Sequence, residues 1–210
     1  AKKGYYLKTG VECEYHLINA DGSDISDPQD TMAKPCYDQQ ALMRRYDVIA
    51  EICDAMLELG WNPYQNDHED ANGQFEMNWD FDDVLLTADR HMFFKFMVKS
   101  IAEKHGLRAT FMPKPFLHLT GNGCHIHISA WDKAGRKNLF LDKKDELGLS
   151  KVSHHFLGGV SSVREGDRSG GATRRGVDPR GGGGGRAETT QRGGRDAARL
   201  DAPHSLWVDF

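Results

Sequence analysis

Residues 110–129 read Thr-Phe-Met-Pro-Lys-Pro-Phe-Leu-His-Leu-Thr-Gly-Asn-Gly-Cys-His-Ile-His-Ile-Ser, which is the most informative stretch of the chain. A glycine-containing turn leads into an alternating segment that predicts a strand over 123–131. Side chains two residues apart on a strand share a face, so His125, His127 and Ser129 should lie together. The pattern indicates a ligand site. A solvated strand face is the alternative, because His-x-His is short and common.

Two acidic segments supply matching side chains. The first alternates apolar and polar residues, which places Glu12 and Glu14 on one face of a strand. The second contributes Glu69 and, after a glycine at a turn, Glu76. Each acidic segment by itself is typical of a solvated face. Combined with the imidazole of His125, however, these oxygen ligands suit Mg²⁺ or Mn²⁺ better than a structural zinc ion.

These segments resemble the catalytic domain of the glutamine synthetase family. The family pattern has a Glu-x-Glu strand, a His-Glu segment running to Gly-Gln-x-Glu, and Lys-Pro followed by Gly-x-Gly-x-His-x-His-x-Ser, and all three occur here in the family order. The resemblance covers residues 4 to about 159. The strings at 34–39 and 64–76 resemble the branch that includes glutamate methylamine ligases, also called gamma-glutamylmethylamide synthetases.

The resemblance implies two divalent ions, Mg²⁺ or Mn²⁺, in a funnel-shaped site. Glu14, Glu69 and Glu76 would hold the ion near the amino-acid substrate. Glu12 and His125 would hold the ion that bridges the nucleotide phosphates.

The resemblance also implies positions for the substrates. His127 and Ser129 would contact ATP, and Gly121 would lie at the glutamate backbone. The implied reaction is phosphoryl transfer from ATP to the side-chain carboxylate of glutamate, followed by attack of ammonia or a small amine such as methylamine on the acyl phosphate. Thr120 stands where many members carry Asn, and Asn122 is the candidate replacement.

The resemblance and the hydrophobic pattern together predict an α+β fold. We expect a partial glutamine synthetase-type catalytic domain with a curved antiparallel sheet and flanking helices. One helix should run from a cap at Asp38 towards Gly60, and another from Asp82 or Asp83 to Gly106. The second helix should bury five apolar side chains, namely Leu86, Phe93, Phe94, Met97 and Ile101.

Composition points to a cytoplasmic protein. The 210 residues are 39% hydrophobic and carry a net charge of −4, with no apolar run of membrane-spanning length. The cysteines Cys13, Cys36, Cys53 and Cys124 show no Cys-x-x-Cys spacing, so reduced thiols are expected. Strand alternation places Cys124 on the buried face, opposite the histidines.

Composition changes abruptly near residue 160. Residues 161–210 hold 11 of the 23 glycines and 9 arginines but no Lys, Ile, Tyr, Asn, Met or Cys. We therefore predict a partial catalytic domain over 1–159 and a disordered, low-complexity Gly/Arg-rich tail over 160–210. A GC-rich gene read out of frame is the leading interpretation of this tail.

The family arginines that clamp phosphates, the closing flap, the third ligand of the phosphate-side ion and the amino-terminal domain are not recognisable. We therefore expect an inactive fragment of an ATP-dependent carboxylate-amine ligase that forms a homo-oligomer when intact. Glutamate, ATP and ammonia or methylamine are its expected partners, without membrane or nucleic acid. The alternatives are an inactive or RG-tailed nucleic-acid-binding protein, or an unrelated His/Glu metal hydrolase or cupin-like oxygenase that prefers zinc or iron.

Overall fold

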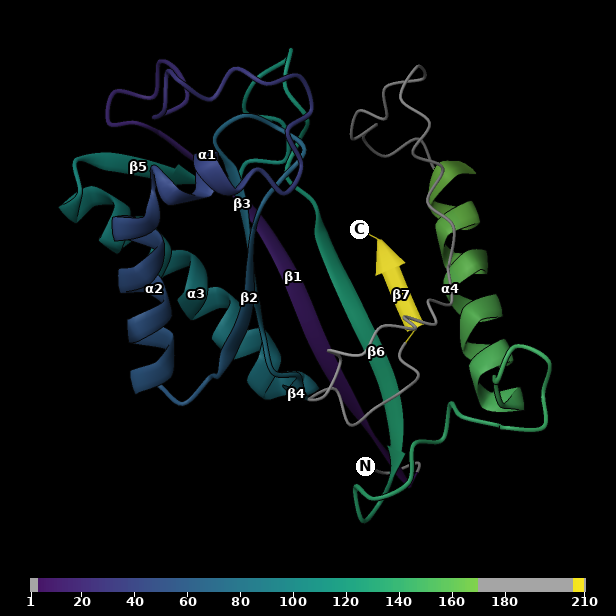
Figure 1. Ribbon diagram of the computed structural model, residues 1–210. Helices are drawn as coiled ribbons and strands as arrows, with labels where there is room; N and C mark the ends of the chain where they lie inside the picture. The colour runs from purple at the N-terminus through teal and green to yellow at the C-terminus, as the bar shows by residue number, and fades with distance from the viewer. Residues whose placement is uncertain (1–3, 170–205, 210) are drawn as a thin grey trace. The chain divides into compact units, whose positions relative to one another are not determined.

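The computed structural model describes residues 4–169 and 206–209 (Figure 1). The chain forms two compact units, one of residues 9–126 and one from the described parts of 1–8 and 127–209. Strands β1 (Tyr5–Asn19) and β6 (Cys124–Asp132) each have residues in both units. None of the helices in the described part of the chain combines the length and the apolar composition that a membrane span requires.

The unit of residues 9–126 is built on antiparallel strands around β1. Strand β3 (Gln74–Trp79) pairs with β1, and β2 (Pro63–His68) pairs with β3. Strand β5 (Leu107–Thr110) pairs with the end of β1, and the short β4 (Asp82–Asp83) also pairs with β1. The predicted α+β class with an antiparallel sheet is confirmed.

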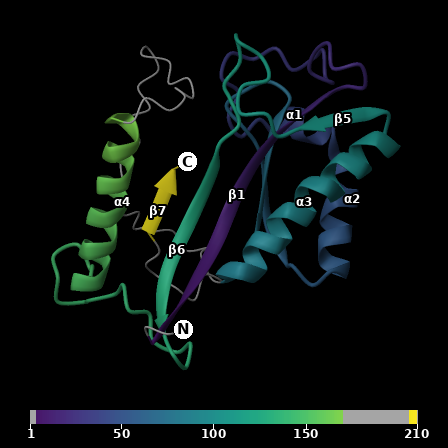
Figure 2. The same cartoon turned by 180° about the vertical axis from the view of Figure 1, so that it is seen from behind.

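The alternation along β1 separates a core face from a polar face. Val11, Cys13, Tyr15 and Leu17 are all buried, whereas Glu12 and Glu14 are half-buried on the other side. The core face packs against two helices, α2 (Tyr46–Glu58) and α3 (Val84–Lys104), which lie side by side (Figure 2). The carboxylates therefore lie on the opposite, polar face of β1.

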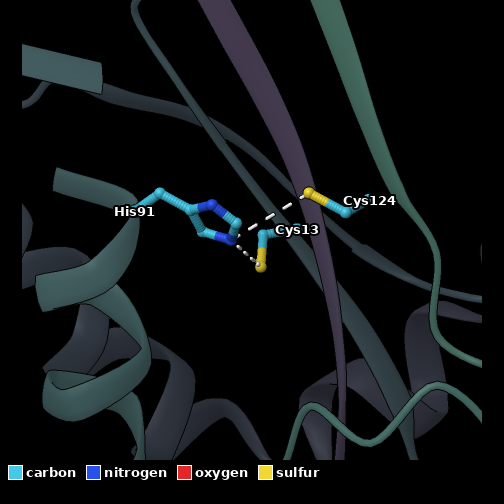
Figure 3. A group of neighbouring side chains, drawn as sticks. All are labelled: Cys13, His91 and Cys124. Carbon is cyan, nitrogen blue, oxygen red and sulfur yellow. Dashed lines mark hydrogen bonds between the residues drawn. The ribbon is translucent and has the colours of Figure 1, made fainter. Parts of the chain in front are cut away.

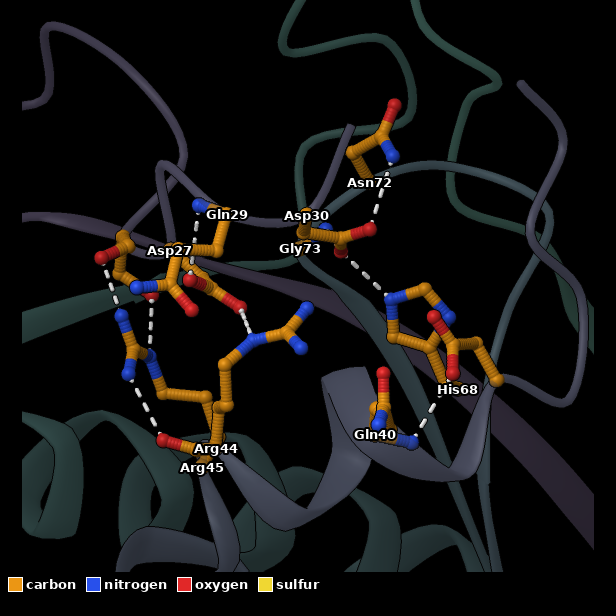
Figure 4. Close-up of polar contacts among 11 residues, drawn as sticks. Asp27, Gln29, Asp30, Gln40, Arg44, Arg45, His68, Asn72 and Gly73 are labelled. Atoms are coloured by element: carbon orange, nitrogen blue, oxygen red, sulfur yellow. Dashed lines mark hydrogen bonds and ion pairs between the residues drawn. The ribbon is translucent and has the colours of Figure 1, made fainter. Parts of the chain in front are cut away.

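The segment predicted as one helix after Asp38 forms two. They are α1 (Gln39–Met43) and α2 (Tyr46–Glu58). Asp38 caps α1 as expected, because its carboxylate accepts a hydrogen bond from the Gln40 backbone. The prediction of a continuous helix was wrong at Arg44 and Arg45. Both guanidinium groups turn back to the preceding loop, and Arg45 lies outside the helical region at φ −122° and ψ 18° (Figure 4).

Helix α3 (Val84–Lys104) begins at an Asp83 cap and is followed by Gly106 at φ +69°, as predicted. Phe94, Met97 and Ile101 are buried, as expected. The prediction was wrong for Leu86 and Phe93, which are 41% and 46% exposed. Each residue turns a helix by about 100°, so these two lie about 80° and 100° from Phe94, at the edge of the buried stripe.

The second unit contains the later part of β6, helix α4 (Lys151–Ser169) and β7 (Leu206–Asp209), which neighbours β6 in the sheet. A small cluster holds it together: Ala130, Phe140 and Leu149, with Phe156 packed against them. Helix α4 continues across the predicted boundary at residue 159. The rest of the predicted tail, residues 170–205 and 210, lies outside the described residues, so the domain boundary and the out-of-frame interpretation stay predictions.

Candidate divalent-cation site

The polar face carries carboxylates in a row across three strands. In the antiparallel register Glu14 of β1 lies opposite Glu76 of β3, and Glu76 lies opposite Asp67 of β2. Directly opposite side chains on one face have Cβ atoms about 4.5–5.5 Å apart. Glu12, two residues from Glu14, extends the same face. The register therefore concentrates negative charge at one place.

Donor atoms converge on Glu76. The ligand atoms of Glu12, Glu76 and His125 all lie within 4.8 Å of one another, and so do those of Asp67, Glu69 and Glu76. His125 Nδ1 lies 3.3 Å from a Glu12 carboxylate oxygen. The structure thus brings together four of the predicted metal ligands. Asp67 was missed by the sequence reasoning, because only the pairing of β2 with β3 places it here.

The electrostatics of this cluster favour a divalent cation. Burial, followed by repulsion from Glu12, raises the pKa of Glu76 to about 8. Burial, followed by repulsion from Glu14 and Asp67, raises the pKa of Glu69 to about 7. Ionising these crowded carboxylates is costly, and a bound Mg²⁺ or Mn²⁺ would relieve that cost. The donor set, mostly carboxylates with one imidazole, fits a hard cation.

Glu14 is held in place by the loop before β6. One of its carboxylate oxygens accepts hydrogen bonds from Gln74 Nε2 at 2.7 Å and from the Gly123 backbone N–H at 2.8 Å. A Cβ atom at Gly123 would lie 3.2 Å from the other oxygen, so a glycine suits this approach. Glu14 lies outside the two donor groups above, and its role as an ion ligand stays a prediction.

The loop itself is braced by Asn122. Its side-chain oxygen accepts from His16 Nδ1 at 2.8 Å and from Gln74 Nε2 at 3.1 Å, and its amide nitrogen donates to backbone carbonyls. The Asn122 side chain therefore stabilises the conformation of this loop. A Cβ atom at Gly121 would lie 2.2 Å from the Pro113 carbonyl oxygen, so close packing already explains this glycine. The place of Gly121 at a substrate backbone stays a prediction.

A buried aspartate fixes the turn that presents Glu69. His68 Nε2 lies 2.7 Å from an Asp30 oxygen that also accepts the Gly73 backbone N–H at 2.7 Å (Figure 4). The other Asp30 oxygen accepts from the Asn72 amide at 2.8 Å. The side chains of Asp30 and His68 are 1% and 0% exposed. Sequence reasoning missed Asp30, since its loop has no periodic pattern.

The two predicted ATP contacts lie in the other unit. His127 is half-buried. Ser129 is 3% exposed, and its hydroxyl accepts a hydrogen bond from Trp131 Nε1 at 2.8 Å. Contact of His127 and Ser129 with ATP stays a prediction.

Comparison with known proteins connects this geometry to one family. The family model of the glutamine synthetase catalytic domain matches residues 1–165. The chain is 74% identical over 160 residues to the glutamine synthetase of Rhizobium meliloti. The aligned region covers 76% of this chain and 37% of that protein. It is 43% identical over 162 residues to the glutamate–methylamine ligase of Methyloversatilis universalis, which covers 75% of this chain and 36% of that protein.

A solved structure of a GmaS–ADP complex has a TM-score of 0.76 at 70% identity, covering 79% of this chain and 38% of that one. The chain therefore spans just over a third of the length of these relatives. The resemblance inferred from the Glu-x-Glu, Gly-Gln-x-Glu and His-x-His patterns is confirmed, and the unrelated hydrolase or oxygenase is not favoured. This chain belongs to the glutamine synthetase family and corresponds to part of its catalytic domain.

Proposed function

We propose that this chain supplies the cation-binding part of an ATP-dependent ligase that joins ammonia or a small amine to the side-chain carboxylate of glutamate. The observation that carries the proposal is the position of Glu76. It lies within 4.8 Å of both the Glu12/His125 group and the Asp67/Glu69 group. One carboxylate shared between two donor groups is suited to two neighbouring cations.

The residues divide between two ion positions. Glu69 and Glu76, with Glu14, are assigned to the ion beside the glutamate substrate. Glu12 and His125 are assigned to the ion beside the ATP phosphates. Bound Mg²⁺ or Mn²⁺ ions would stabilise negative charge on the phosphate oxygens during phosphoryl transfer.

The chain's own contribution is to hold these side chains in place. Asn78 donates to a Glu76 oxygen at 3.0 Å, and Gln74 donates to Glu14. Asp30 fixes the turn beside Glu69. Rigid placement of the ligands lowers the entropy cost of bringing ATP and glutamate into line.

The remaining assignments concern the whole protein. His127 and Ser129 are proposed to contact ATP, and Gly121 to lie at the glutamate backbone. The names of the Rhizobium and Methyloversatilis relatives support ammonia and methylamine, respectively, as candidate acceptors. We propose a cytoplasmic homo-oligomer that forms γ-glutamyl phosphate. The inactivity of the 210-residue chain alone stays a prediction.

A chimera tests the function. Residues 9–126 of this chain would replace the matching segment of the GmaS relative, and ADP release that depends on glutamate would be measured with methylamine and with ammonia. We expect turnover, and a loss of at least about 100-fold on Glu76→Gln. Glu58→Gln, an exposed carboxylate on α2, is the matched control and should be active. A Glu76→Gln chimera as active as this control would contradict the proposal.

A further inference from the structure

A second group of metal-ligating side chains lies on the core side of the same strands. Cys13 of β1, Cys124 of β6 and His91 of α3 point towards one another (Figure 3). His91 Nε2 lies 3.3 Å from Cys13 Sγ and 4.0 Å from Cys124 Sγ. All three donor atoms lie within 4.8 Å of one another. All three residues belong to the unit of residues 9–126.

The separations match those of ligands around one metal ion. Zinc bonds of about 2.3 Å to sulfur and about 2.0–2.1 Å to nitrogen place tetrahedral S and N ligand atoms about 3.5 Å apart. The two observed sulfur–nitrogen distances, 3.3 and 4.0 Å, lie on either side of that value. An ion could therefore enter with small side-chain adjustments.

The surroundings differ from those of the acidic cluster. Cys13 is 2% exposed and belongs to the main hydrophobic core, and Cys124 packs against that core. Cys124 and His91 are half-buried, whereas Cys13 is fully enclosed. His91 Nε2 is within hydrogen-bonding distance of both sulfur atoms, so the three donor atoms already converge on one point.

We propose that Cys13, His91 and Cys124 form a binding site for a soft or borderline transition-metal ion of the zinc class, with water completing the coordination. Thiolate and imidazole ligands select such ions, whereas the carboxylates on the other face select Mg²⁺ or Mn²⁺. The bound ion would tie α3 to β1 and β6. It would thereby stabilise the strands that carry Glu12 and His125.

Cobalt(II) is a suitable probe, because thiolate-bound Co²⁺ absorbs strongly through sulfur-to-metal charge transfer. The reduced, metal-stripped 210-residue chain would be titrated with Co²⁺ and then with Zn²⁺. We expect a thiolate–cobalt band that saturates at one equivalent and is displaced by Zn²⁺. Glu76→Gln should keep this band, because it alters only the acidic face.

Variants locate the ligands. Cys124→Ala should abolish the band, and His91→Gln should weaken Co²⁺ binding by more than the roughly 10- to 100-fold typical of losing an outer-sphere partner. Cys53→Ala is the matched control, since Cys53 is half-buried in the same unit but outside the group, and should keep the band. Circular dichroism melting of each variant would check folding.

Three results would overturn the proposal. The first is a reduced wild-type chain that gives no thiolate–cobalt band, a result that does not depend on any variant folding. The second is a band that persists unchanged in folded Cys124→Ala. The third is a Cys13–Cys124 disulfide that survives mild reductant and consumes both thiols, which thiol labelling would reveal.

Discussion

The two faces of β1 and β6 within residues 9–126 present different chemistry, although the same strands build both. On the polar face Glu12 lies beside His125, among carboxylates that repel one another. On the core face Cys13 and Cys124 lie beside His91, among apolar side chains. Successive side chains on a strand point to opposite faces of the sheet, so one residue packs in the core and its neighbour joins the carboxylate cluster. The core face should govern stability, and the polar face should govern cation binding at some cost to stability.

The largest expected effect on stability comes from a substitution in the core face. Phe94 is 0% exposed, and its ring centroid lies 4.9 Å from that of Trp79 and 6.2 Å from that of Tyr15. Phe94→Ala should lower the free energy of unfolding by about 3–5 kcal/mol, measured by urea denaturation. Phe93→Ala, at the exposed neighbouring position, is the matched control and should cost less than half as much. Equal losses of unfolding free energy in the two variants would show that α3 packs through a different set of residues.

A second prediction concerns the support beneath the polar face. Asp30→Ala removes the acceptor of His68, Asn72 and Gly73, which leaves buried donors without a partner. We expect a loss of about 2–4 kcal/mol in the free energy of unfolding. Mn²⁺ binding should also weaken, because the turn that carries Glu69 loosens. Asp21→Ala removes only exposed hydrogen bonds from Ser23, so it should cost less stability and leave Mn²⁺ affinity unchanged. Unaltered Mn²⁺ affinity in a folded Asp30→Ala chain would show that this brace does not support the site.

The smallest stability effect should have the opposite sign and depend on pH. The pKa of Glu76 rises from its ordinary value of 4.5 to about 8 in the folded chain. Between these values the folded state keeps a proton that the unfolded state releases, so this group's contribution to stability is lost as pH rises. Glu76→Gln, always neutral, avoids that loss. In metal-free buffer its stability relative to wild type should increase from pH 5 to pH 8 by more than about 1 kcal/mol.

Urea midpoints at pH 5, 6, 7 and 8, with a chelator present, would measure this difference. Excess Mn²⁺ should shrink the advantage of Glu76→Gln at pH 8, because the ion binds the wild-type folded state. A difference between the two chains that is flat with pH would mean that Glu76 is not crowded as the structure indicates.

Local sequence patterns predicted which residues lie on the polar face, but not how strands distant in sequence bring them together. Alternation alone placed Glu12 and Glu14 opposite Cys13, and Asp83 and Gly106 marked the ends of α3. These features depend only on neighbouring residues and on backbone preferences.

Features that depend on distant segments could not be predicted this way. Asp67 reaches the cluster through a strand register that includes an irregularity near Pro63. Asp30 reaches the turn beside Glu69 from a loop without periodicity. The side chains of Arg44 and Arg45 interrupt a pattern that is otherwise helical. In each case a tertiary contact overrides the local signal.

Calorimetric Mn²⁺ titration of the 210-residue chain at pH 8 tests the central claim most directly, that Glu76 joins two donor groups into a divalent-cation site. Wild type and the Glu58→Gln control should bind Mn²⁺ alike. Glu76→Gln should bind at least about 100-fold more weakly, because both donor groups lose a shared ligand. Equal Mn²⁺ affinity in Glu76→Gln and wild type would contradict the account.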